Sequence, residues 1–306
     1  MGWGGAAEIR LGNKPAQLGR QQMVARFRGD SLTKLLRKCT PLVFKRGYRM
    51  LQARVQTLSA KYHCPVCSSR VNTFERLPEF YFENQQKYGF PFKADEAETC
   101  NHLGYLCPFC KASDRDRLYA LYLRNYLKRL NASGAIKIID FAPSVPLSNF
   151  IRQQVARSEQ RFSYRTADYS GADVDDKVDI IDLRAYAENQ FDFFICSHVL
   201  EHVTDDRKAL RELYRILQPG GKGILMVPII LSLNQIDEDA TVTNEGERWR
   251  RFGQDDHVRI YSKNGFIERV EESGFIVHQY GQDFFGKDLF IRTGITSQSV
   301  LYVVEK

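Results

Sequence analysis

Short apolar runs alternate with segments of helical spacing from residue 136 onward. The runs predict seven strands, at 136–140, 162–168, 177–183, 191–197, 222–228, 274–281 and 299–305. The intervening segments 148–158, 206–217 and 262–273 read as helices. This alternation predicts an α/β fold with a seven-stranded, doubly wound sheet, in which ligands bind past the carboxyl ends of the strands where the strand order reverses.

Polar residues at the ends of these predicted strands are the first candidates for a site. Asp140 ends the first strand and Asp168 ends the second, where an acid can accept hydrogen bonds from ribose hydroxyls. Asp179 lies in the third, where an acid could accept from the amine of adenine. The fourth strand ends in Ser197 and His198, before a helix that Thr204 or Asp205 would cap.

The turn "DFAPSVP" (140–146) follows the first strand and carries Ala142 and Ser144 where a nucleotide-binding turn would carry glycines. Glycine there permits a positive φ and a close approach of the backbone to the ligand. The small side chains of Ala142 and Ser144 still leave room for a ligand, but these residues do not adopt a positive φ as readily as glycine. The two prolines restrict the backbone of the turn further. The turn is either a cofactor loop without its glycines or an ordinary connection, and the surrounding strands favour the cofactor loop.

Two C-x-x-C knuckles, "CPVC" and "CPFC", place Cys64, Cys67, Cys107 and Cys110 in a pattern that predicts a structural zinc site. Four thiolates close a tetrahedral shell and leave no open position. Disulfides or a thioredoxin-like redox pair are the alternatives, although a cytosolic chain would not keep disulfides. Cys100 and His102 are near enough in sequence to replace a ligand.

These patterns divide the chain into four parts. We expect a basic, partly helical arm over 1–60, a zinc-binding module over 61–112, a connecting helix over 113–133 and the α/β domain over 134–306. Residues 111–130 have leucines and tyrosines at helical spacing, and "NASG" ends that helix.

The stretches "FDFFICSHVLEHV", "ALRELYRILQPGG" and "GILMVP", all within 191–228, resemble the class I S-adenosylmethionine-dependent methyltransferases, in particular their type 11-like subgroup. The resemblance covers roughly 134–306 and implies a Rossmann-like methyltransferase fold. The cysteine segment with "CPFCKASDRDR" is similar to the zinc-ribbon-like N-terminal module of some of these enzymes, and "RFGQDDHVRIYS" (251–262) resembles a loop of the same subgroup.

The resemblance implies S-adenosyl-L-methionine as the cofactor and gives its contacts. These are Asp140, Ala142 and Ser144 near the methionine end, Asp168 at the ribose, Asp179 and Ile180 at the adenine, and Ser197 and His198 beside the methyl group. Tyr169, directly after Asp168, is a further cofactor contact. The family's first motif is acid-x-Gly-x-Gly-x-Gly, from which "DFAPSVP" departs.

Catalytic candidates follow if the acceptor is a hydroxyl, because a base then assists methyl transfer. We expect His257, oriented by Asp256 in a loop over the mouth of the cleft, or His198 at the end of the fourth strand. His257 as a structural or substrate-orienting residue is the alternative. His202 reads as a satisfied residue at the start of a helix.

Charge singles out the N-terminal arm. Residues 1–63 hold 13 of the 44 Lys and Arg residues but only two of the 37 acids. This excess of positive charge would favour binding to an anionic membrane surface or to nucleic acid. The alternatives are a solvated N-terminal segment without a partner and an organelle transit peptide. The longest apolar stretch near the C-terminal half, 223–231, is shorter than a membrane span. We expect a cytoplasmic protein that can touch the inner face of the membrane.

Three function classes fit these features. The first is a methyltransferase (EC 2.1.1.-) that O-methylates a small molecule or a glycan, including a lipid-linked sugar. The second is an RNA-directed methyltransferase that grips nucleic acid with the zinc module and the arm. It is less favoured, since "SHVLEH" is not the Asn/Asp-Pro-Pro-aromatic signature of base amino methylation. The third is a binding protein that kept the fold and lost the cofactor.

Overall fold

The computed structural model describes residues 60–130, 134–171 and 173–306. All of them belong to one compact unit. The predicted basic arm lies outside the described residues except for residue 60. Among the described residues, no helix combines the length and the apolar character that crossing a membrane requires.

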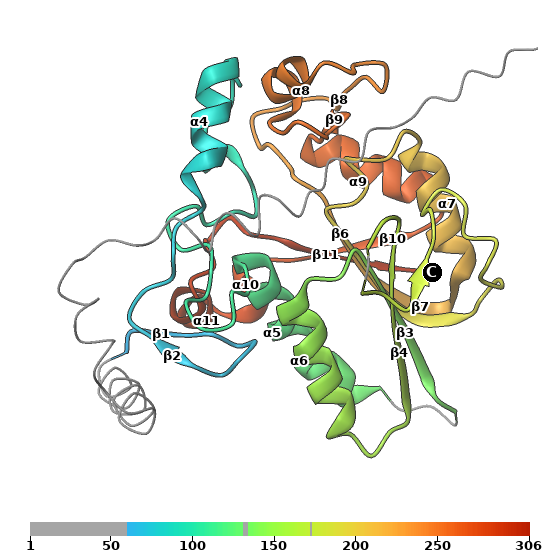
Figure 1. The fold of residues 1–306 in the computed structure, drawn as a ribbon. Coiled ribbons are helices and arrows are strands. Elements are labelled where there is room, and N and C mark those ends of the chain that lie inside the picture. The colour runs from blue at the N-terminus through green and yellow to red at the C-terminus, as the bar shows by residue number, and fades with distance from the viewer. Residues whose placement is uncertain (1–59, 131–133, 172) are drawn as a thin grey trace, which may run out of the picture. The chain divides into compact units, whose positions relative to one another are not determined.

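A seven-stranded sheet forms the centre of this unit (Figure 1). Its strands are β3 (Ile136–Phe141), β4 (Phe162–Asp168), β5 (Asp176–Lys177), β6 (Phe191–Ser197), β7 (Leu217–Met226), β10 (Ile276–Tyr280) and β11 (Leu301–Glu305). They lie in the order β10-β11-β7-β6-β3-β4-β5. β11 is antiparallel to both neighbours, and the other pairs are parallel. The expected α/β fold with a seven-stranded doubly wound sheet is confirmed.

The middle strand β6 shows why the apolar runs become central strands. Phe193 and Phe194 are fully buried, as is Cys196. A parallel strand covered on both faces is apolar along its whole length. On the neighbouring strand, a Cβ at Gly223 would lie 2.4 Å from the Phe194 ring, so glycine is needed for this packing.

Helices cover both faces of the sheet, with α5 and α6 on one side and α7 and α9 on the other (Figure 1). Their bounds are α5 (Asp114–Arg129), α6 (Val145–Ala156), α7 (Asp206–Ile216) and α9 (Lys263–Glu272). A polar side chain caps the start of each. Ser144 caps α6, Asp205 caps α7 and Ser262 caps α9 by accepting a hydrogen bond from a first-turn backbone N–H.

The strand expected over 177–183 is wrong for most of that range, because β5 ends at Lys177. The chain turns directly afterwards. The Asp182 backbone N–H donates to the Asp179 carbonyl (2.9 Å), and the Ile181 N–H donates to Asp179 Oδ1 (3.1 Å). An aspartate that accepts from the backbone two residues on favours a turn, and here it outweighs the apolar run.

Two other boundaries differ from the expectation. α6 begins at Val145 rather than at 148, since Ser144 caps it and Pro146 fits its first turn. β7 begins at Leu217 rather than at 222, so "QPGG" belongs to the strand and not to a separate turn. Its pairing with β6 shifts register there, and Gly220 takes a φ of 75°. The preceding helix ends at Ile216, one residue before the predicted end at 217.

Shorter elements surround the sheet. They are β1 (Tyr62–His63), β2 (Arg70–Val71), α4 (Glu79–Tyr88), η1 (Ala94–Glu96), β8 (Asp237–Glu238), α8 (Glu245–Phe252), β9 (Arg259–Ile260), α10 (Gln282–Phe285) and α11 (Lys287–Thr293). α4 lies between the two cysteine knuckles in sequence and packs on α8, where the rings of Tyr88 and Trp249 stack with centroids 6.4 Å apart.

Arg117 on α5 ties the cysteine segment to the sheet domain. Its buried guanidinium donates to the carbonyls of Tyr105 (2.9 Å), Thr293 (2.7 Å) and Gly294 (3.0 Å), and lies 3.8 Å from the centre of the Phe74 ring. A buried charge is tolerated when its donors are used, as they are here. The connecting helix therefore packs against both parts, while the predicted domain boundaries stay a prediction.

Candidate active site and metal centre

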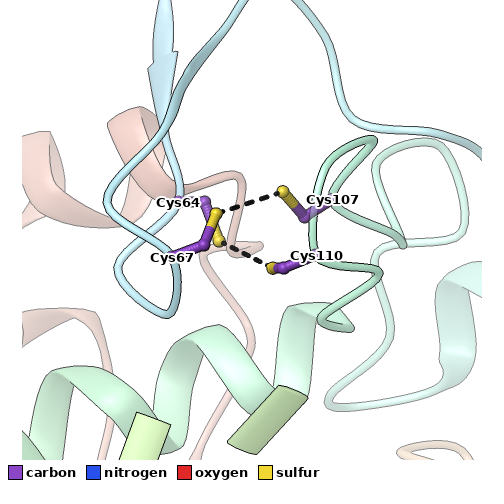
Figure 2. A group of neighbouring side chains, drawn as sticks. All are labelled: Cys64, Cys67, Cys107 and Cys110. Carbon is purple, nitrogen blue, oxygen red and sulfur yellow. Dashed lines mark hydrogen bonds between the residues drawn. The ribbon is translucent and has the colours of Figure 1, made fainter. Parts of the chain in front are cut away.

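The four knuckle cysteines form one cluster (Figure 2). Cys64 Sγ lies 3.8 Å from Cys110 Sγ, and Cys67 Sγ lies 3.8 Å from Cys107 Sγ. Tetrahedral zinc with Zn–S bonds of about 2.3 Å requires sulfurs about 3.8 Å apart. The cluster therefore has the dimensions to hold one metal ion.

Both knuckles have the same backbone turn. The N–H of Ser68 donates to the carbonyl of Cys64, and the N–H of Lys111 donates to that of Cys107. Ser68 and Lys111 both take a positive φ, 61° and 62°. This repeated turn aims each pair of thiols at a common point. Cys100 lies outside the cluster, as does His102, whose ring contacts Phe82.

The carboxyl edge of the sheet has its switch point between β3 and β6, where the strand order reverses. A residue other than glycine takes a positive φ directly after each of these strands, Ala142 at 51° and His198 at 57°. Hydrogen bonds to the next strand hold both, from Ala142 N–H to the Ala167 carbonyl and from His198 N–H to the Met226 carbonyl, each 2.8 Å. Such strain persists only where the surroundings impose it, and it concentrates at functional sites.

The turn after β3 is attached to the connecting helix. Ser144 Oγ donates to Asp116 Oδ1 (2.7 Å) while it caps α6. Asp116 also accepts from the backbone N–H of Ser113, in a capping box at the start of α5. Ser144 is thus occupied by two structural hydrogen bonds, whereas Ala142 is exposed.

Asp140 lies under this turn. Its side chain is 2% exposed and accepts a 2.6 Å hydrogen bond from the Tyr164 hydroxyl. Burial raises the pKa of Asp140 to about 7, although the Tyr164 hydrogen bond opposes the shift. Any contact of this acid with a ligand would have to pass through other groups.

The end of β4 presents an acid and an aromatic ring. Asp168 Oδ1 accepts from the backbone N–H groups of Ser170 (2.7 Å) and Gly171 (2.6 Å), which fixes the carboxylate in a turn. Tyr169 is 76% exposed. A fixed carboxylate beside an exposed ring can bind a ribose and the face of a base.

Asp179 and Ile180 lie in the turn after β5. Asp179 is half-buried and uses Oδ1 to hold the turn, whereas Ile180 is 5% exposed. Parallel strands place the ends of β3, β4, β5 and β6 at one edge, so the predicted cofactor residues share that edge. Their role as cofactor contacts stays a prediction.

Ser197 at the end of β6 is held by the connecting helix. Its Oγ lies 2.7 Å from the Tyr119 hydroxyl. Tyr119 is 2% exposed. The sequence offered no signal for this pair, because Tyr119 reads as one of several tyrosines on an apolar helix face.

Three histidines surround Glu201, a carboxylate that is 0% exposed. His198 Nδ1 lies 3.0 Å from Glu201 Oε1, and His202 Nε2 lies 3.9 Å from the same oxygen. His257 faces His202 edge to face, with ring centroids 4.7 Å apart. The structure therefore brings His198 and His257 together around an acid that the sequence analysis did not assign.

Two expectations about this cluster are wrong. His257 does not cover an open cleft mouth, since it is 2% exposed and its Nδ1 lies 3.2 Å from the Phe252 carbonyl. Asp256 contacts His202, with 3.3 Å between Oδ2 and Nδ1, rather than orienting His257 through its Nδ1. The usable sequence signal was "VLEHV", in which an acid lies inside an apolar run.

In this histidine cluster, a negatively charged Glu201 lies beside a positively charged His202. Burial opposes a charge on His202, but the hydrogen bond to Asp256 and the charge of Glu201 outweigh it and raise its pKa to about 9. Burial lowers the pKa of His198 and of His257 to about 4. Burial also opposes a charge on Glu201, but the facing imidazoles hold its pKa at about 2.

Comparison with known proteins identifies the domain. Residues 125–225 match a family model described as a methyltransferase domain. The chain is 29% identical over 104 residues to the ubiquinone/menaquinone biosynthesis C-methyltransferase UbiE of Haemophilus ducreyi, covering 29% of this chain and 39% of that protein. It is 43% identical over 53 residues to UbiE of Klebsiella pneumoniae (strain 342), covering 16% and 21%. The chain thus spans less than half the length of these relatives.

The chain can also be compared with two solved structures. The S-adenosylmethionine-dependent methyltransferase from Mesorhizobium loti is 13% identical and has a TM-score of 0.39, covering 62% of this chain and 98% of that one. The CMeT domain of the citrinin polyketide synthase is 14% identical with a TM-score of 0.41, covering 63% and 51%. The family match and the strand order together show a methyltransferase domain with the Rossmann-like methyltransferase fold.

Proposed function

We propose that this chain, whose residues 125–225 carry a methyltransferase domain, transfers a methyl group from S-adenosylmethionine to a hydroxyl oxygen of a small molecule or glycan. The observation that carries the proposal is the pair of strained turns, at Ala142 and His198, on either side of the switch point. A ligand site at this point explains why two residues other than glycine keep a costly conformation.

The residues at this edge fit the cofactor. Asp168 would accept hydrogen bonds from the ribose hydroxyls, because its carboxylate is already fixed by two backbone N–H groups. Tyr169 would lie against the adenine, and the backbone at Ala142 would approach the methionine end. The sulfonium of the bound cofactor supplies an activated methyl group, so the protein mainly has to position the acceptor and exclude water.

For the cysteine cluster we propose a structural zinc ion. The support is the match between the 3.8 Å sulfur separations and tetrahedral Zn–S geometry. Four thiolates leave no position for a substrate, and the cluster belongs to the segment that Arg117 joins to the sheet domain. The zinc would hold the connecting helix against the cofactor edge.

The two UbiE relatives support a small-molecule acceptor, since they are C-methyltransferases of ubiquinone/menaquinone biosynthesis. Whether the acceptor atom is oxygen or carbon is open to direct measurement. Purified protein is incubated with a metabolite extract of the source cells and cofactor labelled with ¹³C at the methyl group. The chemical shift of the labelled carbon separates O-methyl from C-methyl products.

The matched control is Asp168→Asn, which keeps an oxygen for the two backbone N–H groups but loses the charge and one acceptor. We expect an O-methyl signal with the wild-type protein that is much weaker with Asp168→Asn at the same limiting cofactor concentration. A C-methyl signal would overturn the assignment of oxygen as the acceptor atom but would still support methyltransferase activity. No transfer to any component of the extract would contradict the proposed activity.

A further inference from the structure

We propose that Glu201, His202 and His257 bind a divalent cation of the first transition series, at a centre separate from the cysteine cluster. One ligand atom from each residue lies within 4.8 Å of the other two. The inference does not depend on the methyl acceptor, since it rests on the ligand set itself. It goes beyond the proposed function by assigning a metal centre beside the cofactor edge.

Glu201 is the first reason. Its carboxylate is 0% exposed, and within the described part of the chain neither of its oxygens has a hydrogen-bond partner. The contact of His198 Nδ1 with Oε1 is short, at 3.0 Å, but lacks hydrogen-bond geometry. A buried carboxylate without hydrogen bonds is costly, and a coordinated cation would compensate for it more directly than the imidazole of His202, whose Nε2 lies 3.9 Å away.

The outer nitrogens of the two imidazoles are the second reason. His202 Nδ1 lies 3.3 Å from Asp256 Oδ2, and His257 Nδ1 lies 3.2 Å from the Phe252 carbonyl. Histidines that bind metals usually donate their other ring N–H to a carboxylate or a backbone carbonyl, which fixes the tautomer and the ring. Both histidines have this arrangement, so each keeps Nε2 as the free ligand atom.

The backbone holds the two segments of the cluster together. The Val258 N–H donates to the Glu201 carbonyl (2.9 Å), and the buried Arg259 guanidinium donates to the Leu200 carbonyl (2.5 Å). These bonds fix the loop after β6 against the loop before β9. The ligands therefore come from two segments whose relative position is set without the cation, as expected for a preformed site.

The donor set decides the class of ion. Two imidazoles and one carboxylate suit Zn²⁺, Fe²⁺, Co²⁺ or Mn²⁺, whereas thiolate clusters select zinc and other soft ions. Bonds of about 2.1 Å would bring the ligand atoms to about 3–3.5 Å from one another, so modest side-chain rotations close the site. Three protein ligands leave coordination positions open, as in centres that bind a water or a substrate oxygen.

The test uses the full chain with zinc already bound and excess metal removed. Mn²⁺, Co²⁺ and Zn²⁺ are titrated separately by calorimetry, without cofactor, and free Mn²⁺ is also followed by electron paramagnetic resonance. We expect one further equivalent of at least one cation per chain. Affinity should fall at least about tenfold in His202→Ala and His257→Ala, and in Asp256→Asn, which changes only the outer partner of His202.

His278→Ala is the matched control. His278 pairs with Glu305 at 2.9 Å on β10, outside the cluster, so the same substitution there should leave cation affinity unchanged. Near-ultraviolet circular dichroism checks that each variant is folded. If a histidine variant unfolds, Asp256→Asn still tests the proposal, because its side chain is 61% exposed and the substitution should not disturb the fold. Absence of a further equivalent for all three cations, or unchanged affinity in Asp256→Asn and in the folded histidine variants, would overturn the proposal. Because no cofactor is present, either result is independent of methyl transfer.

Discussion

The hydroxyl of Tyr119, on the helix that follows the cysteine cluster, lies 2.7 Å from Ser197 Oγ at the end of the central strand β6. The two residues are far apart in sequence, and their contact joins the helix after the cysteine cluster to the sheet at the proposed cofactor edge. Two residues before Tyr119 on the same helix, Arg117 donates to the carbonyls of Gly104 and Tyr105 in the cysteine segment. The first turns of this helix therefore contact both the cysteine segment and the end of β6.

Tyr119→Phe removes this hydrogen bond and leaves the ring in place. Because Tyr119 is buried, we expect the free energy of unfolding to fall by about 1 kcal/mol, measured by urea denaturation. Cofactor affinity should fall with it, as Ser197 loses its partner. Tyr122→Phe on the same helix is the control, and equal effects of the two changes would argue against a specific role for the contact.

Loss of the metal at the cysteine cluster should destabilise the whole described unit. The double variant Cys107→Ser and Cys110→Ser is expected to lose one zinc per chain by elemental analysis. Its Tm should fall by roughly 5–10 °C, since a structural zinc contributes directly to folding. Cys100→Ser, a half-buried thiol outside the cluster, should keep the zinc. A double variant with full zinc content would show that other ligands hold the ion.

Ala142→Gly should stabilise the protein. Ala142 holds a φ of 51°, which glycine adopts without steric cost. Relief of this strain should outweigh the greater freedom of glycine in the unfolded chain and raise the free energy of unfolding by up to about 1 kcal/mol. Ala120→Gly, in the interior of α5, has no strain to relieve and should destabilise instead. Destabilisation by Ala142→Gly would mean that the turn is not strained.

Asp140 predicts a pH dependence of stability. Its pKa is about 7 in the folded protein, above the ordinary value of 3.8, because it is buried. The folded state therefore holds a proton that the unfolded state releases, and stability falls as pH rises from about 4 to 7. The full effect is on the order of 4 kcal/mol. Asp140→Asn should remove this pH dependence. The free energy of unfolding of the variant, measured by urea denaturation, should therefore rise relative to that of the wild-type protein between pH 5 and pH 8. An equal pH dependence of both proteins would contradict the buried, protonated acid.

Strong periodicity made much of the fold predictable. β6 and α7 lie where their apolar patterns put them, because a strand buried on both faces and an amphipathic helix have few alternatives. The run at 177–183 failed because one aspartate side chain competes with the ladder for backbone hydrogen bonds. Apolar content alone does not reveal such a turn.

The sequence predicted that the candidate site lies at the carboxyl edge of the sheet, but it did not predict which side chains contact one another there. Strand ends gave the positions of Asp168 and His198, since the topology brings the carboxyl ends together. The burial of His257 and the pairing of Asp256 with His202 depend on how a distant loop packs against the loop after β6. Contacts between segments so far apart in sequence have no local pattern from which to read them.

The most direct measurement of the central claim is calorimetric titration of the zinc-loaded chain with S-adenosylhomocysteine, the product form of the cofactor. The account predicts one binding site per chain, with affinity reduced about 10- to 100-fold in Asp168→Asn, because a ribose contact to a carboxylate contributes about 1.5–3 kcal/mol. Asp173→Asn, an exposed acid of the same loop, should bind as wild type does. No binding by the wild-type protein, or the same affinity in Asp168→Asn, would contradict a cofactor site at this edge of the sheet.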